Sequence, residues 1–133
     1  MPEHGARHRG LWRRLGSRRC IVIDGSMRPT LEPGDRLLVD THALRRRLPG
    51  VGELVVLRDP EGADRDLVKR VTAVDPATGS VTVRGDAPDR SRDSRSFGAV
   101  PVRQLVGVVW FRYLPTEKRG PIPSDAASSP PSS

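Results

Sequence analysis

Turn-forming residues interrupt this chain at such short intervals that no long helix fits between them. The sequence has 133 residues, of which 13 are Gly and 13 are Pro. The clearest turn signals are Pro33-Gly34-Asp35, Pro49-Gly50, Asp59-Pro60-Glu61-Gly62, Asp75-Pro76 and Thr78-Gly79. This spacing excludes a coiled coil or a long helical bundle. No run approaches the ~18–20 apolar residues of a membrane helix, so no transmembrane segment is expected.

The segments between these turns are short and rich in Val, Ile and Leu, which is typical of β-strands. One segment, His42–Leu48, favours a helix of one or two turns. The expected strands are Cys20–Ile23, Arg36–Asp40, Glu53–Arg58, Leu67–Val74, Ser80–Arg84 and Leu105–Tyr113. Together they predict a mostly β fold, a small, curled, antiparallel β-domain.

Charge and composition divide the chain into three parts. Residues 1–19 hold six Arg and one Glu and form a basic arm, either disordered or an amphipathic helix. Residues 20–114 form the folded domain, and residues 115–133 a disordered tail rich in Pro and Ser. The arm leaves a peripheral membrane contact or non-specific binding of nucleic acid open. The apolar run that follows the arm, Cys20–Ile23, is too short for a secretory signal, so a cytoplasmic protein is expected.

The supply of metal-binding and redox side chains is small. The single cysteine, Cys20, excludes an intramolecular disulfide and a cysteine-based zinc site. The histidines are His4, His8 and His42, and the first two lie in the polar arm. Neither a metal nor another cofactor is therefore expected.

Lysine is rare in a chain that otherwise relies on arginine. Of 23 basic residues, two are lysines, Lys69 and Lys118. Lys69 lies in the apolar strand segment 67–74, where alternation places it on the face of Leu67 and Val71. A desolvated lysine has a lowered pKa and can act as a neutral base, which arginine cannot. The strand alone leaves open that Lys69 extends its amine to solvent instead.

A serine turn follows the first expected strand. In 23–31, Gly25 precedes Ser26 and allows an unusual dihedral angle, and Pro29 prevents the strand from continuing. Such a turn would expose the Ser26 hydroxyl and direct its N–H outward. An exposed serine becomes a nucleophile when a base is close, and is otherwise an ordinary turn residue.

A third polar segment, 85–98, alternates in charge and is dense in hydroxyl groups. Alone it predicts a solvated loop, or one held by an ion pair between Asp93 and Arg95.

The three segments together resemble the type I signal peptidases, serine proteases that use a Ser-Lys dyad. Gly25-Ser26-Met27-x-Pro29-Thr30-Leu31-x-x-Gly34-Asp35 resembles the nucleophile box, and Lys69-Arg70-Val71 the general-base box. Gly85-Asp86 and Ser91-x-Asp93-Ser94-Arg95-x-x-Gly98 resemble the third box in order and spacing. The resemblance covers about residues 21–113 and implies the β-rich fold of signal peptidases and LexA-type proteases.

The resemblance also implies roles for individual residues. Ser26 would be the nucleophile, with its N–H as one oxyanion-hole donor, and neutral Lys69 the general base. Ser91 matches the serine that orients the lysine. The other matched residues support the site or shape the loop beside the substrate cleft: Gly25, Met27, Pro29, Gly85, Asp86, Asp93 and Arg95.

Two positions depart from the pattern. Ala87 replaces the asparagine that usually follows Gly-Asp in the third box, and we expect this to weaken a turn. Asp24 stands where some members have a serine that serves the oxyanion hole. Because a carboxylate opposes a developing oxyanion, Asp24 is expected to point away from it.

These features predict a serine endopeptidase that removes an N-terminal extension from a precursor protein. The chain is similar to compact, unanchored members of the family, which favours a nickel-type superoxide dismutase precursor as substrate. A generic signal-peptidase-like protease acting on another precursor is the alternative. A non-catalytic relative, a basic nucleic-acid-binding protein and a Ser-His-Asp hydrolase using His42 also stay open. The sequence gives no indication of an oligomeric state.

Overall fold

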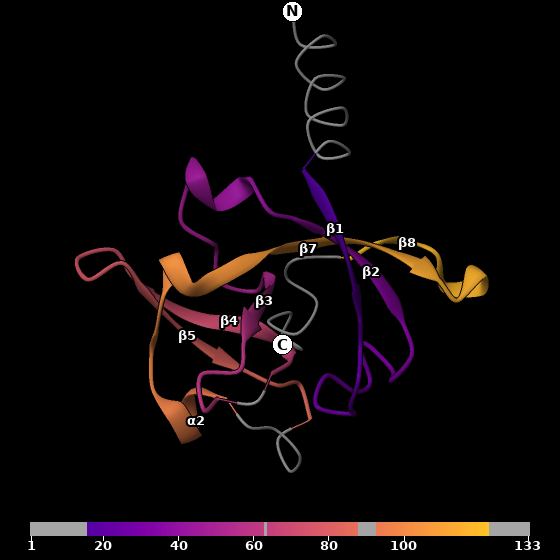
Figure 1. The fold of residues 1–133 in the computed structure, drawn as a ribbon, viewed down its shortest axis with the longest axis horizontal. Helices are drawn as coiled ribbons and strands as arrows, with labels where there is room; N and C mark the ends of the chain where they lie inside the picture. Colours follow the sequence, from indigo (N-terminus) through magenta and orange to yellow (C-terminus); the bar gives the residue numbers. More distant parts are fainter. Residues whose placement is uncertain (1–15, 63, 88–92, 123–133) are drawn as a thin grey trace, which may run out of the picture.

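One curled antiparallel sheet makes up most of the molecule. The computed structural model describes residues 16–62, 64–87 and 93–122. The strand order is β1-β2-β7-β3-β4-β5-β6, and β8 pairs with β7 (Figure 1). The strands are β1 (Ser17–Ile21), β2 (Arg36–Asp40), β3 (Leu54–Arg58), β4 (Asp66–Asp75), β5 (Ser80–Arg84), β6 (Val100–Pro101), β7 (Leu105–Leu114) and β8 (Gly120–Pro121). The predicted fold class is confirmed.

The expected strands agree closely with those observed. The bounds of β2 and β5 are as predicted, β3 and β7 differ by one residue at one end, and β4 is longer by one residue at each end. The first strand begins three residues earlier than predicted, at Ser17, and ends at Ile21. The two-residue strands β6 and β8 were not predicted, because segments so short carry no apolar alternation.

The sheet is curled by irregularities in its pairing. Register shifts interrupt the pairing of β2 with β7, of β3 with β7, and of β4 with β5. Such bulges increase local twist and bend the strand. Beside the shifted pairing of β2 with β7, a Cβ on Gly107 of β7 would lie 2.4 Å from the carbonyl oxygen of Asp40. Glycine at this position therefore lets β7 approach β2 closely.

The curled sheet encloses apolar residues on both of its faces. One cluster includes Leu54 and Val56 of β3, and the other includes Val55 and Leu57 of the same strand. Because neighbouring residues of a strand point to opposite faces, β3 is buried on both sides. The same holds for the first half of β4, where residues 67–71 are all buried.

The helical segments are short. The predicted helix at His42–Leu48 is the 3-10 turn η1 (Ala43–Arg45). The others are α2 (Ser94–Phe97), η3 (Val102–Gln104) and η4 (Thr116–Lys118). Among the described residues, no helix has the length and apolar character needed to cross a bilayer.

The folded structure extends past both predicted domain boundaries. At the N-terminal side β1 begins at Ser17. At the C-terminal side β8 pairs with β7, and Ile122 packs against the first apolar cluster. The rest of the predicted arm and tail, residues 1–15 and 123–133, lies outside the described residues.

Candidate active site

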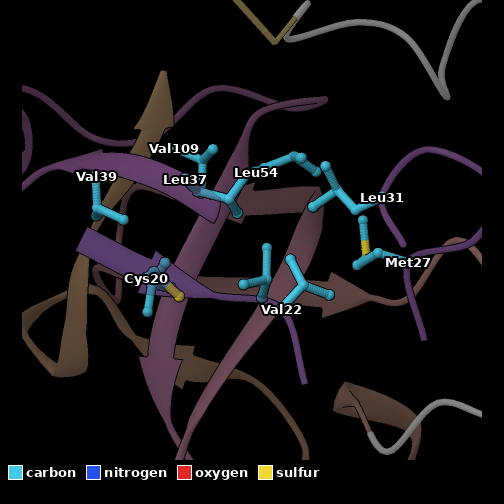
Figure 2. Packing of buried hydrophobic residues seen from close by; sticks show 10 residues of the cluster. Cys20, Val22, Met27, Leu31, Leu37, Val39, Leu54 and Val109 are labelled. Carbon is cyan, nitrogen blue, oxygen red and sulfur yellow. The ribbon is translucent and has the colours of Figure 1, made fainter. Parts of the chain in front are cut away.

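The loop after β1 is anchored in the apolar core on either side of Ser26. Val22, Met27 and Leu31 are buried members of the first cluster (Figure 2). The Leu31 N–H also donates to the carbonyl oxygen of Met27 at 2.9 Å. Ser26 is held between these anchors and is 4% exposed. The expectation of an exposed hydroxyl is therefore wrong, because packing of the flanking side chains draws the loop inward.

Asp24 turns back onto the serine. The Ser26 N–H donates to Asp24 Oδ1 at 3.0 Å. This is an Asx turn, in which a carboxylate accepts from the backbone two residues further on. The expectations that Asp24 points away and that the Ser26 N–H is directed outward are therefore wrong. The Asp24-Gly25-Ser26 sequence carries the signal for this turn.

Gly25 serves the loop by its small size. It is not among the glycines with a positive φ, so the predicted unusual dihedral angle is wrong. A Cβ at this position would lie 2.8 Å from Nη1 of Arg28. The absence of a side chain at Gly25 thus leaves room for the Arg28 guanidinium, which also donates from Nε to Glu32 Oε1 at 2.7 Å.

Lys69 lies deep in the fold. It belongs to β4, its Cα pairs with that of Val55 in β3, and it is 1% exposed. A lysine extending its amine to solvent at a strand edge is excluded by this burial. Desolvation is the main cause that lowers the pKa of Lys69.

Four charged side chains modify this effect. Asp24 and Asp93 stabilise the ammonium and partly restore the pKa of Lys69, while Arg65 and Arg95 lower it further. Burial would raise the pKa of Asp24, but hydrogen bonds from the amide and hydroxyl of Ser26, with the charges of Lys69 and Arg65, outweigh it and lower that pKa. Asp24 therefore interacts with both members of the predicted dyad.

Asp93 is fixed by several donors. Its Oδ2 accepts from the Gly85 N–H at 3.1 Å and from Arg95 Nη2 at 2.8 Å. Its Oδ1 accepts from the N–H and from Nε of Arg95, both at 3.0 Å. The Asp93 side chain is fully buried, so these bonds offset the desolvation of its charge. The ion pair predicted between Asp93 and Arg95 is confirmed.

The turn at 85–87 ties the three sequence segments together. Asp86 accepts from Nε and Nη2 of Arg70 at 2.9 and 2.8 Å and from the Thr30 hydroxyl at 2.5 Å. The Ala87 N–H donates to the carbonyl oxygen of Ser26 at 2.9 Å. The backbone of Ala87 thus supports the nucleophile loop although the usual asparagine side chain is missing.

Arg70 and Thr30 lie in the sequence motifs but were given no role there. Arg70 is 3% exposed and also donates from Nη1 to the Gly52 carbonyl oxygen at 2.7 Å. Thr30 and Asp86 are 56 residues apart in the chain. No local pattern announces a contact at such separations, so only the folded structure identifies these supporting residues.

A hollow runs beside the serine between two chain segments. One side is formed by Ile21, Val22, Ile23 and Asp24 with Ser26 and Met27, and the other by Asp66, Leu67 and Val68. Ile21 and Ile23 are 48% and 52% exposed. Asp66 is paired with Arg18 and Arg58. Apart from Asp24, Ser26 and the paired Asp66, the residues that line the hollow are apolar.

Three other predicted residues are distributed differently. Pro29 is exposed and follows a cis peptide bond with Arg28, and it is not part of the hollow. Ser91 lies outside the described residues. His42 follows β2 where Asp40 pairs with Ser17, at the opposite end of β1 from the serine loop. The structure thus offers no support for a Ser-His-Asp triad.

The site thus combines a buried serine, a buried lysine and a small, mainly apolar hollow on a curled β-domain. Comparison with known proteins defines the class: the family described as "Signal peptidase, peptidase S26" matches residues 16–78, a range that contains both Ser26 and Lys69.

Individual relatives agree with this match. The mitochondrial ATP-independent inner membrane protease subunit 1b of Arabidopsis thaliana is 36% identical over 118 residues, covering 73% of this chain and 70% of the relative. The mitochondrial inner membrane protease subunit 1 of Xenopus tropicalis is 31% identical over 121 residues, covering 77% and 72%. A probable signal peptidase I-1 of Synechocystis sp. is 28% identical over 145 residues, covering 77% and 74%. The chain belongs to the S26 signal peptidase family and is a serine-type peptidase.

Proposed function

We propose that this chain is an endopeptidase that removes N-terminal segments from precursor proteins, with Ser26 as nucleophile and Lys69 as general base. The observation that carries the proposal is the position of Lys69. It is buried with a lowered pKa, and the charge of Asp24, which accepts a hydrogen bond from the Ser26 N–H, acts on it. A lysine in this state has the neutral amine that a general base needs near neutral pH.

The reaction follows from these two groups. Neutral Lys69 Nζ takes the proton of Ser26 Oγ while the oxygen attacks the scissile carbonyl carbon. The ammonium then gives this proton to the leaving amine as the peptide bond breaks, which leaves an acyl-enzyme on Ser26. Water, deprotonated by Lys69, hydrolyses the ester and restores both groups.

Asp93 and Arg95 support the base. Their ion pair stands beside Lys69 and fixes one of the charges that set its pKa. Gly85 and Asp86 hold this segment against the nucleophile loop through Asp93 and Thr30. Ser91, Met27, Pro29 and Gly25 keep the roles that the family pattern implies.

The strand edges beside the hollow at Ser26 are suited to an extended peptide. Pairing of β4 with β5 begins at Arg70, so the segment Asp66–Val68 has an edge that β5 does not cover. The sheet order also makes β1 an edge strand. A substrate strand lying along these edges gains main-chain hydrogen bonds, and the apolar walls accept small apolar side chains next to the cut.

The relatives favour a precursor of the signal-peptide kind over the nickel superoxide dismutase precursor. Their names describe signal peptidase I and inner membrane proteases, and none mentions superoxide dismutase. We therefore propose substrates presented at a membrane surface. The nickel superoxide dismutase precursor is retained as one arm of the test.

Cleavage of purified precursors tests this function. The wild type is incubated with a signal-peptide-bearing precursor in anionic lipid vesicles and, separately, with a nickel superoxide dismutase precursor. We expect cleavage in the first arm, and loss of it in Ser26→Ala and Lys69→Arg. Lys118→Arg is the matched control, because it makes the same exchange at the other lysine of the chain. Absence of cleavage in both arms contradicts the proposal, and cleavage in the second arm alone restores the narrower substrate.

A further inference from the structure

The carboxylate of Asp24 accepts a hydrogen bond from the backbone amide that the proposed reaction needs. The Ser26 N–H donates to Asp24 Oδ1 at 3.0 Å. The Ser26 hydroxyl also helps to lower the pKa of Asp24. The backbone amide of the proposed nucleophile is therefore engaged with Asp24.

This arrangement is incompatible with the transition state. An oxyanion-hole donor must lie about 2.7–3.1 Å from the oxygen that develops negative charge. The Asp24 oxygen already lies at such a distance from the Ser26 N–H. A second anionic oxygen at the same amide would meet a like charge in a site with little water, where the repulsion is strong. The carboxylate must therefore leave the amide before the substrate carbonyl can react there.

Asp24 also acts on the base. Its negative charge favours the protonated form of Lys69, the form that cannot accept the serine proton. Asp93 has the same effect, whereas Arg65 and Arg95 oppose it. Asp93 is fixed by Gly85 and Arg95, but Asp24 is held by Ser26. Of the two carboxylates that act on Lys69, Asp24 is thus the one that substrate binding can displace.

The position of Asp24 allows this displacement. It lines the hollow beside Ser26 and is intermediate in exposure, so a peptide that lies along this face can contact it. Arg65 interacts with the charge of Asp24 and stays partly exposed. Arg65 is already paired with Asp59, so a displaced Asp24 would share this cation with a second carboxylate.

We infer that Asp24 is a positioning residue that keeps the unliganded site inactive by holding the Ser26 amide until a substrate carbonyl replaces it. The inference rests on the proposed function of Ser26 and Lys69. Displacement of Asp24 frees the oxyanion donor and removes one charge that stabilises protonated Lys69. Substrate binding therefore completes the site and activates the base in one movement.

Two substitutions separate the parts of this role. Asp24→Asn removes the charge but keeps an oxygen that can accept from Ser26, and Asp24→Ala removes both. We expect Asp24→Ala to raise kcat/KM at neutral pH by about tenfold, because an oxyanion-hole donor contributes ~10²–10³ in kcat and no side-chain oxygen competes for it. Asp24→Asn still competes through its amide oxygen, so we expect it to raise kcat/KM less. The acidic limb of the pH–rate profile should also move to lower pH. Asp64→Asn is the control, since its side chain is 90% exposed.

A spectroscopic measurement makes the test independent of any substrate. With lysine labelled at Cε, NMR of a chain with two lysines gives two signals, and Lys118→Arg assigns them. We expect the Lys69 signal to titrate at lower pH in Asp24→Asn than in the wild type, and the Ser26 amide signal to lose the acid titration step caused by Asp24. A merely structural role of Asp24 would leave the titration of Lys69 unchanged, whereas the amide step reports the hydrogen bond alone.

The outcomes are distinguishable from failure of the proposed function. If the wild type cuts no precursor but both NMR changes occur, the proposed function is wrong and the control of Ser26 and Lys69 by Asp24 stands. Unchanged titration of Lys69 in Asp24→Asn overturns the inference. Folded Asp24→Asn and Asp24→Ala variants that cut more slowly than the wild type also overturn it.

Discussion

Lys69 and Arg70 are neighbours in β4 and are both nearly inaccessible to solvent, yet their surroundings differ. Arg70 has a full set of partners: Asp86 binds it through two oxygens, and the Gly52 carbonyl accepts a third bond. Lys69 lies among two carboxylates and two guanidinium groups whose effects oppose one another, and desolvation lowers its pKa. Two cations one residue apart thus serve a structural purpose and a chemical one.

The difference follows from the chemistry of the two side chains. A guanidinium stays protonated and matches a carboxylate through two parallel bonds, so Arg70 can join β4 to the turn at Asp86. An amine can lose its proton when it is desolvated, so burial makes Lys69 reactive. Arg70 and Lys69 show that the effect of burying a cation depends on the groups that surround it.

The largest expected effect is on cleavage when Lys69 becomes arginine. Lys69→Arg keeps a positive charge on β4 but removes the group that can lose a proton. We expect the cleavage rate to fall by about 10²–10⁴-fold, which is the usual contribution of a general base. The measurement is kcat/KM on the precursor that the wild type cuts, with Lys118→Arg as control. A Lys69→Arg variant that cuts as fast as the wild type would show that Lys69 is not the base.

The next effect is on stability when Arg70 loses its charge. Arg70→Met leaves the Asp86 carboxylate without its bidentate partner in a largely buried place. Removing one member of a buried pair costs about 3–5 kcal/mol of the free energy of unfolding. Urea denaturation measures this loss. Arg84→Met, an exposed arginine that faces Arg70 in the pairing of β4 with β5, should change stability by less than about 0.5 kcal/mol.

Removal of the Lys69 amine should have the opposite sign. Since the pKa of Lys69 is lower in the folded than in the unfolded chain, the unfolded chain binds the proton more tightly, and stability rises with pH between the two pKa values. We expect Lys69→Met to be more stable than the wild type at neutral pH, and this difference to shrink toward alkaline pH. Urea denaturation at pH 7 and pH 10 measures it. A Lys69→Met variant that is less stable than the wild type at pH 7 would contradict the proposed cost of burying this amine.

The smallest expected effect is on stability and concerns the hydrogen bond that Thr30 donates to Asp86, the partner of Arg70. Thr30→Val removes the hydroxyl that donates to Asp86 at 2.5 Å and keeps the shape of the side chain. Loss of one such bond costs about 1 kcal/mol, more when the acceptor is charged. Thermal unfolding measures it, and Thr82→Val on β5 is the control. An equal loss of stability in both variants would show that the Thr30 contact with Asp86 adds nothing specific.

Much of this fold could be predicted from the sequence because its strands are bounded by clear turns. β5 lies between Gly79 and Gly85 and contains alternating apolar residues, β2 follows the turn signal Pro33-Gly34-Asp35, and the bounds of both were predicted correctly. Pairs that are distant in the chain, such as Arg70 with Asp86, could not be predicted, because they depend on the tertiary fold. The two-residue strand β8 has no pattern of its own and exists because β7 offers it an edge.

The candidate site shows the same division. The sequence pointed to Ser26 and Lys69 through their residue types and their place in the family pattern. The prediction that Asp24 points away was wrong, because it was based on the negative charge that a bound substrate develops during the reaction. The unliganded loop follows a simpler rule, by which an aspartate accepts a hydrogen bond from the amide two residues further on.

The pKa of Lys69 in the unmodified, unliganded protein is the most direct measurement of the central claim. With the Lys118 signal assigned through Lys118→Arg, the Cε signal of Lys69 can be followed from neutral to alkaline pH. The proposed mechanism predicts a titration well below the ordinary value of lysine, with the acidic limb of the cleavage profile at the same pH. Titration of Lys69 at or above that ordinary value would contradict a neutral lysine base.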